Sequence, residues 1–427
     1  MTGSAALLWL LSACDPFARW PEPGTGFPHA YTPLTDLEPY EQVRFETGTW
    51  EPLVDLEETA LYVRKSLDHR AGAPLEELVH FGLARPGAIV ESHPRLSVVG
   101  DIMPMSGAVA GFAQPASSLL DGDLRIGNLE TPVSTLHPTE RSELVDAFGL
   151  YAFNAPVELI DGLPLDVLQL TNNHTLDVGV EGFADTALNV EAAGITPLGF
   201  DGNGLLTALP DGVVVGLLAY TWGSNTPVPD GVDIGIVPFG LLEQEIDLAR
   251  VRDDAAALRE LGASHVVLLA HWGFEYEYWP DPHFMVLGRR LVAAGADVVV
   301  GHGPHTPQAA ELCAVDLPLA RPDVGQCAVR SGVGEPRVAA ILYSLGNFGT
   351  DLATIPLQVG IVGSVSLDPR GGVSGLGWAP VARVVEDGTT RVVPMDDLVL
   401  NAGSTGPYAE ESARLDTLLG TRWRRSR

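Results

Sequence analysis

Basic residues, cysteines and long apolar runs are all scarce in this 427-residue chain. Lys and Arg together number 25 against 55 Asp and Glu, which leaves a formal net charge of −30. Such a charge repels nucleic acid and other polyanions at long range, so we expect no nucleic-acid partner. An anionic substrate would need metal ions to supply positive charge locally. No apolar run reaches the ~18 residues of a membrane-spanning helix, so we expect no transmembrane segment.

The three cysteines divide into one residue near the start of the chain and one pair. Cys14 closes Leu11-Ser12-Ala13-Cys14 after an apolar run, and this pattern resembles the lipobox of bacterial lipoproteins, in which the cysteine carries the lipid. The leader is short and lacks Lys and Arg, so a buried N-terminal helix with an incidental cysteine is the alternative. A lipobox implies an extracytoplasmic protein, anchored by lipid to a membrane of a bacterial envelope.

The other two cysteines, Cys313 and Cys327, bracket a proline-containing loop. In an exported protein this pair predicts a disulfide, and closing a loop of that size contributes on the order of 3 kcal/mol of stability. In a cytoplasmic protein, two free thiols are the alternative. Both cysteine predictions therefore depend on export.

The length predicts one large domain with appendages, because single cores stop growing at about 250–300 residues. Strand-like runs alternate with helical spacing from Ser97 to Leu367, which is typical of parallel βαβ units. Shorter segments with turn signals between 359 and 395 predict antiparallel strands that complete a second sheet. The helical spans expected are Val180–Ala193, Ile246–Leu261, Phe284–Ala294 and Ala409–Leu419, the last followed by Arg422-Trp423-Arg424-Arg425 as a solvated tail.

We therefore divide the chain into four parts. Residues 1–14 form a lipoprotein-type signal, and 15–95 form an N-terminal extension with helices. Residues 96–367 form the main domain, and 368–427 contribute C-terminal strands and a helix that complete it.

Five apolar runs of strand length each end in Asp, Asn, Glu or His. In an open α/β sheet, groups beyond the carboxyl ends of adjacent strands meet in one crevice, so residues distant in sequence are expected to form one site. Carboxylate, amide and imidazole groups are also ligands for divalent transition metals. The residues at these exits are Asp101, Asn128, Glu130, Asn172, Asn173, His174, His271, His302 and His305.

Each group taken singly has an ordinary structural explanation. Asp101 and the Asn173-His174 pair suit capping positions. Glu130 suits a solvated surface and His271 a hydrogen-bonded core position, while His302 and His305 suit a surface turn. Their shared location at strand exits favours a common site over these separate explanations.

Six motifs together resemble the CapA family of capsule and poly-γ-glutamate synthesis. They are Val99-Gly100-Asp101-Ile102-Met103, Gly127-Asn128-Leu129-Glu130-Thr131-Pro132, Asn172-Asn173-His174-Thr175-Leu176-Asp177-Val178-Gly179, His271-Trp272-Gly273-Phe274-Glu275-Tyr276, Gly301-His302-Gly303-Pro304-His305 and Tyr343-Ser344-Leu345-Gly346-Asn347-Phe348. The resemblance implies an α/β fold similar to the calcineurin-like metallophosphoesterases. That fold is a four-layer α/β/β/α sandwich of metallophosphoesterase type, here with an N-terminal extension, with two metals at the strand ends.

The resemblance also implies roles for matching residues. The implied metal ligands are Asp101, Glu130, Asn173, His271, His302 and His305, and the implied ions are two divalent metals such as Mn, Zn, Fe or Mg. His174 with Asp177 resembles a catalytic dyad that faces the substrate. Met103 departs from the phosphoesterase pattern, because a His stands two residues after the first Asp there and a thioether is a soft ligand. Asn128-Leu129-Glu130 replaces the bridging Asp, which leaves Glu130 as the expected bridging carboxylate.

Aromatic residues next to His271 are candidates for the wall of a substrate cleft. We expect Trp272, Glu275 and Tyr276 there together with Asn128, and aromatic packing under a loop is the alternative for Trp272, Tyr276, Tyr278 and Trp279.

The resemblance implies a metal-dependent hydrolase that acts on a phosphoester or related bond in capsule or poly-γ-glutamate metabolism, and the lipobox-like pattern predicts that this hydrolase is exported. Its partner would be an anionic cell-surface polymer or a small phosphoester. A non-catalytic factor in a capsule assembly and export complex is the alternative, which Met103 favours and the charge of −30 disfavours. Hydrolysis of an amide bond in the polymer uses the same metal chemistry.

Overall fold

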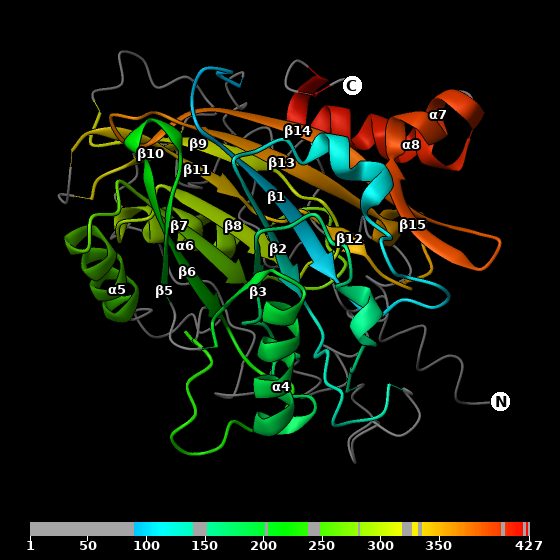
Figure 1. The fold of residues 1–427 in the computed structure, drawn as a ribbon. Helices are drawn as coiled ribbons and strands as arrows, with labels where there is room; N and C mark the ends of the chain where they lie inside the picture. The colour runs from blue at the N-terminus through cyan, green and yellow to red at the C-terminus, as the bar shows by residue number, and fades with distance from the viewer. Residues whose placement is uncertain are drawn as a thin grey trace, which may run out of the picture.

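The computed structural model describes residues 89–139, 152–200, 204–237, 248–280, 282–317, 327–331, 335–402, 406–421 and 424–425. The predicted signal at 1–14 with its Cys14, and most of the extension at 15–95, lie outside these residues. Two mixed β-sheets pack face to face in the described part, with helices on both outer sides (Figure 1). None of the helices described here combines the length and the apolar character needed to cross a membrane.

The first sheet is built around a buried central strand, and its order is β15-β14-β13-β1-β2-β3-β4, with β12 beside β1. β1 to β4 run parallel to one another, and seven of the eight residues of β1 are buried. A strand covered on both faces has this nearly continuous apolar run. The strands are β1 (Arg95–Ile102), β2 (Leu124–Leu129), β3 (Val167–Gln169), β4 (Thr196–Leu198), β12 (Asn347–Gly349), β13 (Val359–Leu367), β14 (Val373–Glu386) and β15 (Thr389–Pro394).

The last three strands are antiparallel, as expected, but they belong to this first sheet. β13 pairs with β1, and Leu96 lies opposite Val365. The expectation that they complete a second sheet was therefore wrong. Alternation of apolar residues identifies a strand but carries no information about its distant partner.

The second sheet has the order β10-β9-β11-β8-β7-β6-β5. Its central strands β6, β7, β8 and β11 are parallel, whereas β5 and β9 join antiparallel. A disulfide joins Cys313 in β9 to Cys327 in β10. The strands are β5 (Gly204–Ala208), β6 (Val214–Thr221), β7 (His265–His271), β8 (Val298–His302), β9 (Ala310–Val315), β10 (Cys327–Val329) and β11 (Arg337–Leu342).

Three apolar clusters separate four layers and confirm the expected α/β/β/α sandwich. One cluster joins α5 and α6 to the second sheet, one fills the space between the sheets, and one joins α4 to the first sheet. The helices are α4 (Gly179–Ala192), α5 (Ala249–Glu260), α6 (Pro282–Ala293), α7 (Met395–Ala402) and α8 (Pro407–Leu415), with short helices η2 (Gln114–Leu119), η4 (Val157–Leu159), η5 (Pro210–Gly212), η6 (Ile355–Gln358) and η7 (Asp416–Gly420). The predicted helical spans agree with α4 and α6 to within two residues.

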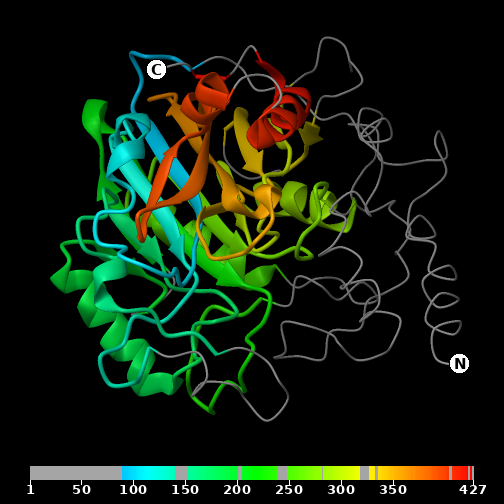
Figure 2. The same ribbon diagram turned by 90° about the vertical axis from the view of Figure 1, so that its right-hand side faces the viewer.

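The C-terminal helices pack at one end of the sheets (Figure 2). Two of the arginines expected in a solvated tail, Arg424 and Arg425, are instead held by the fold, and Arg422 and Trp423 lie outside the described residues. The Arg424 guanidinium lies 5.3 Å from the centre of the Trp378 ring and pairs with Asp416 at 2.7 Å. Arg425 donates from its backbone to Trp378 and pairs with Asp121 at 2.6 Å. Charge alone did not reveal these acidic partners far away in the sequence.

Candidate metal centre

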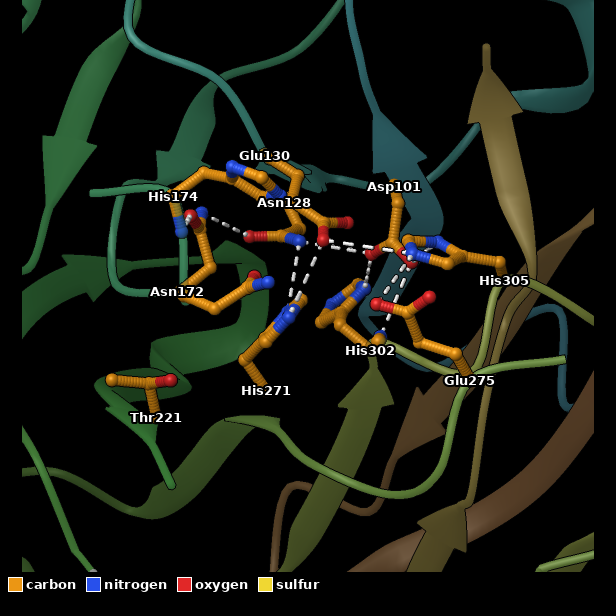
Figure 3. Close-up of polar contacts among 12 residues, drawn as sticks. Asp101, Asn128, Glu130, Asn172, His174, Thr221, His271, Glu275, His302 and His305 are labelled. Carbon is orange, nitrogen blue, oxygen red and sulfur yellow. Dashed lines mark hydrogen bonds and ion pairs between the residues drawn. The ribbon is translucent and has the colours of Figure 1, made fainter. Parts of the chain in front are cut away.

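The side chains at the strand exits converge at the carboxyl ends of both sheets (Figure 3). In the first sheet, the register places Asp101 of β1 opposite Asn128 of β2. In the second sheet, His271 of β7 lies opposite His302 of β8. Parallel neighbours end at the same edge, so short-range pairing alone brings each pair of side chains together.

Two glycines permit the close approach of backbone behind these residues. A Cβ at Gly100 would lie 1.9 Å from the carbonyl oxygen of Gly346, and one at Gly301 would lie 2.0 Å from the carbonyl oxygen of Tyr343. The segment from Tyr343 to Asn347 therefore runs directly against β1 and β8, and Gly346 accepts a hydrogen bond from the Asp101 backbone.

Asp101 is fully buried at the centre of the site and contacts two imidazoles. Its Oδ1 accepts from the Asn128 amide at 2.8 Å and lies 3.1 Å from His302 Nδ1, and its Oδ2 lies 3.2 Å from His305 Nδ1. Burial opposes ionisation of this carboxyl, but the hydrogen bonds and charges of His302 and His305 outweigh burial and hold its pKa well below the usual range. Asp101 is therefore a carboxylate that orients both histidines.

Glu130 is also fully buried, but its charge is poorly compensated. Within the described residues, neither of its carboxylate oxygens has a hydrogen-bond donor. Its Oε1 lies 3.5 Å from His271 Nε2 and 3.7 Å from His305 Nε2. Burial raises the pKa of Glu130 well above its ordinary value, although the charge of His305 opposes this. A buried carboxylate without donors is costly, so this position favours a cation.

His305 is held in one orientation by Asn347. The Asn347 amide group donates to the His305 carbonyl at 3.2 Å, which turns its oxygen toward His305 Nδ1 at 3.1 Å. Since Nδ1 donates to this oxygen or to Asp101, Nε2 faces Glu130 and Glu275. Burial lowers the pKa of His305, but Glu130, Asp101 and Glu275 outweigh it and raise that pKa to about 10. A proton and a metal ion would compete for this nitrogen.

His271 and His302 present suitable metal-binding nitrogens. Burial holds the pKa of His271 well below its ordinary value, so its imidazole is neutral at pH 7. His302 directs Nδ1 toward Asp101, and its Nε2 has no hydrogen-bond partner within the residues described. A carboxylate behind a histidine fixes the tautomer that a metal needs. Ligand atoms of Asp101, Glu130 and His271 all lie within 4.8 Å of one another.

Asn128 and Asn172 form an amide chain beneath the site. The Asn172 amide donates to Asn128 Oδ1 at 3.1 Å and to the Leu129 carbonyl at 2.8 Å. Asn128 is fully buried and donates to Asp101, so it supports the carboxylate rather than lining an open cleft. Asn173, expected as the amide ligand, keeps a buried Oδ1 without a hydrogen-bond donor in the described chain. That oxygen is available to a metal.

His174 and Asp177 form a tight pair next to these groups. His174 Nδ1 lies 2.6 Å from Asp177 Oδ2, which also accepts the Phe153 backbone N–H at 2.6 Å. The Phe153 ring stacks on the imidazole at 4.1 Å. The Asn225 amide lies 3.4 Å from both ring nitrogens of His174. Sequence reasoning missed Phe153 and Asn225, because neither follows an apolar strand directly.

The aromatic residues after His271 divide between the core and the site. Trp272 is 1% exposed, packs against Tyr343 and donates its indole N–H to the Tyr343 carbonyl. Tyr278 and Trp279 belong to the same core cluster. These three follow the packing alternative, so the expected cleft role of Trp272 is corrected. The Tyr276 ring lies 5.9 Å from His305 and borders the site.

Met103 has a thioether where the phosphoesterase pattern has an imidazole. Its side chain is 5% exposed, and its sulfur accepts a hydrogen bond from the Thr350 hydroxyl at 3.5 Å. The remaining donor set consists of carboxylates, imidazoles and an amide oxygen, a combination that fits divalent ions. The site can therefore bind a divalent metal beside a positioned His-Asp pair.

The comparisons with known proteins point to one family. The family model described as Bacterial capsule synthesis protein PGA_cap matches residues 95–351. The Capsule biosynthesis protein CapA of Bacillus anthracis is 27% identical over 274 residues, which cover 60% of this chain and 59% of the relative. The PGA biosynthesis protein CapA of Bacillus subtilis (strain 168) is 27% identical over 279 residues, 60% of this chain and 63% of the relative. The chain thus spans about 60% of the length of these relatives.

Among solved structures, the 5'-nucleotidase precursor from Thermus thermophilus is similar at 14% identity. The match covers 77% of this chain and 59% of that chain, with a TM-score of 0.40.

Proposed function

Because this chain belongs to the bacterial capsule synthesis protein PGA_cap family, we propose that it is a metal-dependent hydrolase of cell-surface polymer metabolism. Its substrate is a phosphoester or related bond in a cell-surface polymer or its precursor, within the metabolism of a capsule or of poly-γ-glutamate. The observation that carries this proposal is the buried Glu130 carboxylate, which lacks hydrogen-bond donors in the described chain and faces the imidazoles of His271 and His305. A cation there would compensate its charge.

Asp101, Glu130, Asn173, His271, His302 and His305 are the residues that would hold the metal. When bound, divalent ions supply Lewis-acid charge for the substrate oxygen and lower the pKa of a nucleophilic water. Bound divalent ions would also attract an anionic substrate locally, which the net charge of −30 would otherwise repel.

In this proposal, His174 handles the proton of the leaving group. Asp177 holds Nδ1, so Nε2 is the nitrogen that meets a substrate. Stacking on Phe153 fixes the plane of the ring. With both constraints, the imidazole can donate a proton without moving, as general acid catalysis requires.

Export is part of the proposal. The lipobox-like Leu11-Ser12-Ala13-Cys14 supports it, and so does the Cys313–Cys327 disulfide, because disulfides persist mainly outside the cytoplasm. Mass spectrometry of membrane-extracted protein should find an acylated N-terminal Cys14. An unmodified Met1 on the mature protein would contradict export by this route.

A non-catalytic role in polymer assembly is the second candidate, and Met103 favours it. The thioether occupies the place where a hydrolytic site would have an imidazole, and it is already engaged by Thr350. Metal binding without turnover on phosphomonoesters, phosphodiesters and polyglutamate would favour assembly over hydrolysis.

The decisive experiment combines metal analysis with turnover. We expect the purified chain to hold divalent metal and to hydrolyse one of these substrate classes. His174→Ala should keep its metal and lose about 10²–10⁴-fold in rate, the usual contribution of a positioned proton donor. Asp177→Asn should lose less, because the imidazole remains. Loss of metal in His174→Ala would make His174 a ligand and contradict this assignment.

A further inference from the structure

A short segment after β6 joins the second sheet to the residues that follow β3 in the first. The Trp222 backbone donates to the His271 carbonyl at 3.1 Å, so the segment leaves the second sheet beside a candidate ligand. Three residues later, the Asn225 backbone donates to the Asn173 carbonyl at 2.8 Å. Asn225 therefore reaches from one sheet to a functional residue of the other.

The Asn225 side chain meets Asn173 a second time. Its Oδ1 accepts a hydrogen bond from the Asn173 amide nitrogen at 3.4 Å. A side-chain amide has donors at one end and an acceptor at the other, so a partner that binds the nitrogen leaves the oxygen for another ligand. Asn173 is 1% exposed, and its Oδ1 has no donor within the described residues. Asn225 thus selects the orientation in which Asn173 can bind a cation.

The nitrogen of the Asn225 amide lies against the proposed proton donor. It is 3.4 Å from both ring nitrogens of His174. The ring is already held at one atom, because Nδ1 lies 2.6 Å from Asp177 Oδ2. An amide in contact with both nitrogens limits rotation of the imidazole about this hydrogen bond. One side chain from the second sheet therefore contacts a candidate ligand and the proton donor of the first sheet.

We propose that Asn225 is a positioning residue, which leaves the Asn173 amide oxygen free for the cation and keeps His174 in place beside it. This inference rests on the proposed metal-dependent function. Each sheet contributes part of the site, and the segment after β6 fixes one part relative to the other. Partners behind a metal ligand contribute about 10–100-fold in metal affinity or activity, because they orient the ligand before the ion binds.

The test measures Mn²⁺ binding to the metal-stripped full chain by titration calorimetry. Asn225→Leu keeps the approximate size of the side chain but removes both polar atoms, so the Asn173 amide is free to turn. We expect the dissociation constant for Mn²⁺ to rise by about 10–100-fold. Asn225→Asp keeps the oxygen that accepts from Asn173 and adds a negative charge, so it should bind Mn²⁺ at least as tightly as wild type. Weaker binding in Asn225→Asp would contradict the inference.

A double-mutant cycle separates positioning from a general structural role. Asn173→Ala should weaken Mn²⁺ binding by itself. Adding Asn225→Leu to that variant should cause no further loss, because the amide that Asn225 orients is gone. A residue that only stabilises the loop would weaken binding equally with and without the Asn173 side chain. Equal losses in the two backgrounds would therefore refute the positioning role.

Thr226→Val is the matched control. The Thr226 hydroxyl donates to the Leu176 carbonyl at 3.2 Å, so it joins the same two segments through a backbone group outside the ligand set. Thr226→Val should keep the wild-type affinity for Mn²⁺. Unchanged affinity in Asn225→Leu, or an equal loss in Thr226→Val, would overturn the inference and leave the proposed function standing. A wild type that binds no Mn²⁺ would contradict both the inference and the proposed function.

Discussion

The Asp101 cluster (Asp101, Glu130 and His271) and the Glu311 cluster are both buried groups of potential metal ligands, and they differ in how their charges are compensated. The second consists of Glu311, Cys313 and Cys327. There, the Arg289 guanidinium meets the Glu311 carboxylate through two hydrogen bonds, at 2.6 and 3.1 Å, and the Tyr343 hydroxyl adds a third at 3.0 Å. The two sulfurs are joined to each other.

In the Asp101 cluster, at the strand exits, the polar groups are not compensated in this way. Within the described residues, Glu130 has no donor and His302 keeps one ring nitrogen without a partner. Proximity of acidic and sulfur or nitrogen ligands is therefore not enough to identify a metal site. The distinguishing property is unsatisfied binding capacity in a buried position.

The variant expected to have the largest effect on stability is Arg289→Met. It leaves the Glu311 carboxylate buried without its cation, and we expect the free energy of unfolding to fall by about 3–5 kcal/mol in urea titrations. Metal stoichiometry should not change. Arg370→Met is the control, because Arg370 pairs with Asp368 at an exposed surface and its loss should leave the unfolding midpoint in place. A small effect of Arg289→Met would mean that Glu311 is not a buried charge.

Removing the disulfide should have a slightly smaller effect. The bridge closes a loop with a sequence separation of 14, and the double variant Cys313→Ser/Cys327→Ser should lose about 3 kcal/mol of stability. Urea unfolding and metal analysis of the same sample separate the effect of the disulfide on stability from any effect on metal binding. If the variant lost its metal, the Glu311 cluster would not be independent of the site.

Metal itself should stabilise only through the Asp101 cluster. At a free Mn²⁺ concentration of 100 times Kd, the free energy of unfolding of wild type should rise by about 2.7 kcal/mol per site. Glu130→Gln should lose most of this gain, because the variant keeps the shape but lacks the charge. Thermal unfolding with Mn²⁺ and with chelator measures both values, and an undiminished gain in the variant would remove Glu130 from the ligand set.

The smallest effect is a pH dependence without metal. Burial raises the pKa of Glu130 well above 4.5, so the folded state retains a proton that the unfolded state releases. Stability contributed by this proton is present below pH 4.5 and is lost as pH rises toward the folded pKa, by at most about 1.4 kcal/mol per pH unit. Wild type should therefore lose stability relative to Glu130→Gln across this range. If the pH profiles of wild type and Glu130→Gln ran parallel in chelator, Glu130 would ionise equally in the folded and unfolded states.

The strand-exit argument could place the ligands because it depends only on local pairing. Asp101 lies one residue before the end of β1, His302 is the last residue of β8, and the ends of parallel strands coincide. Asn347 could not be assigned in this way, because its contact with His305 requires the loop after β11 to return to β1. The role of Trp272 could not be decided from the sequence for another reason. An aromatic residue beside a ligand suits either a cleft or the core, and only burial distinguishes them.

The pairing of β1 with β13 has a consequence for how the chain folds. β2 covers one edge of β1 early in the sequence, but the other edge is covered only by β12 and β13, about 250 residues later. Until those strands arrive, β1 offers an open hydrogen-bonding edge with apolar side chains, which is a template for aggregation. The first sheet is therefore expected to close slowly and late, and a chain interrupted before Val359 would lack the strand that protects its centre.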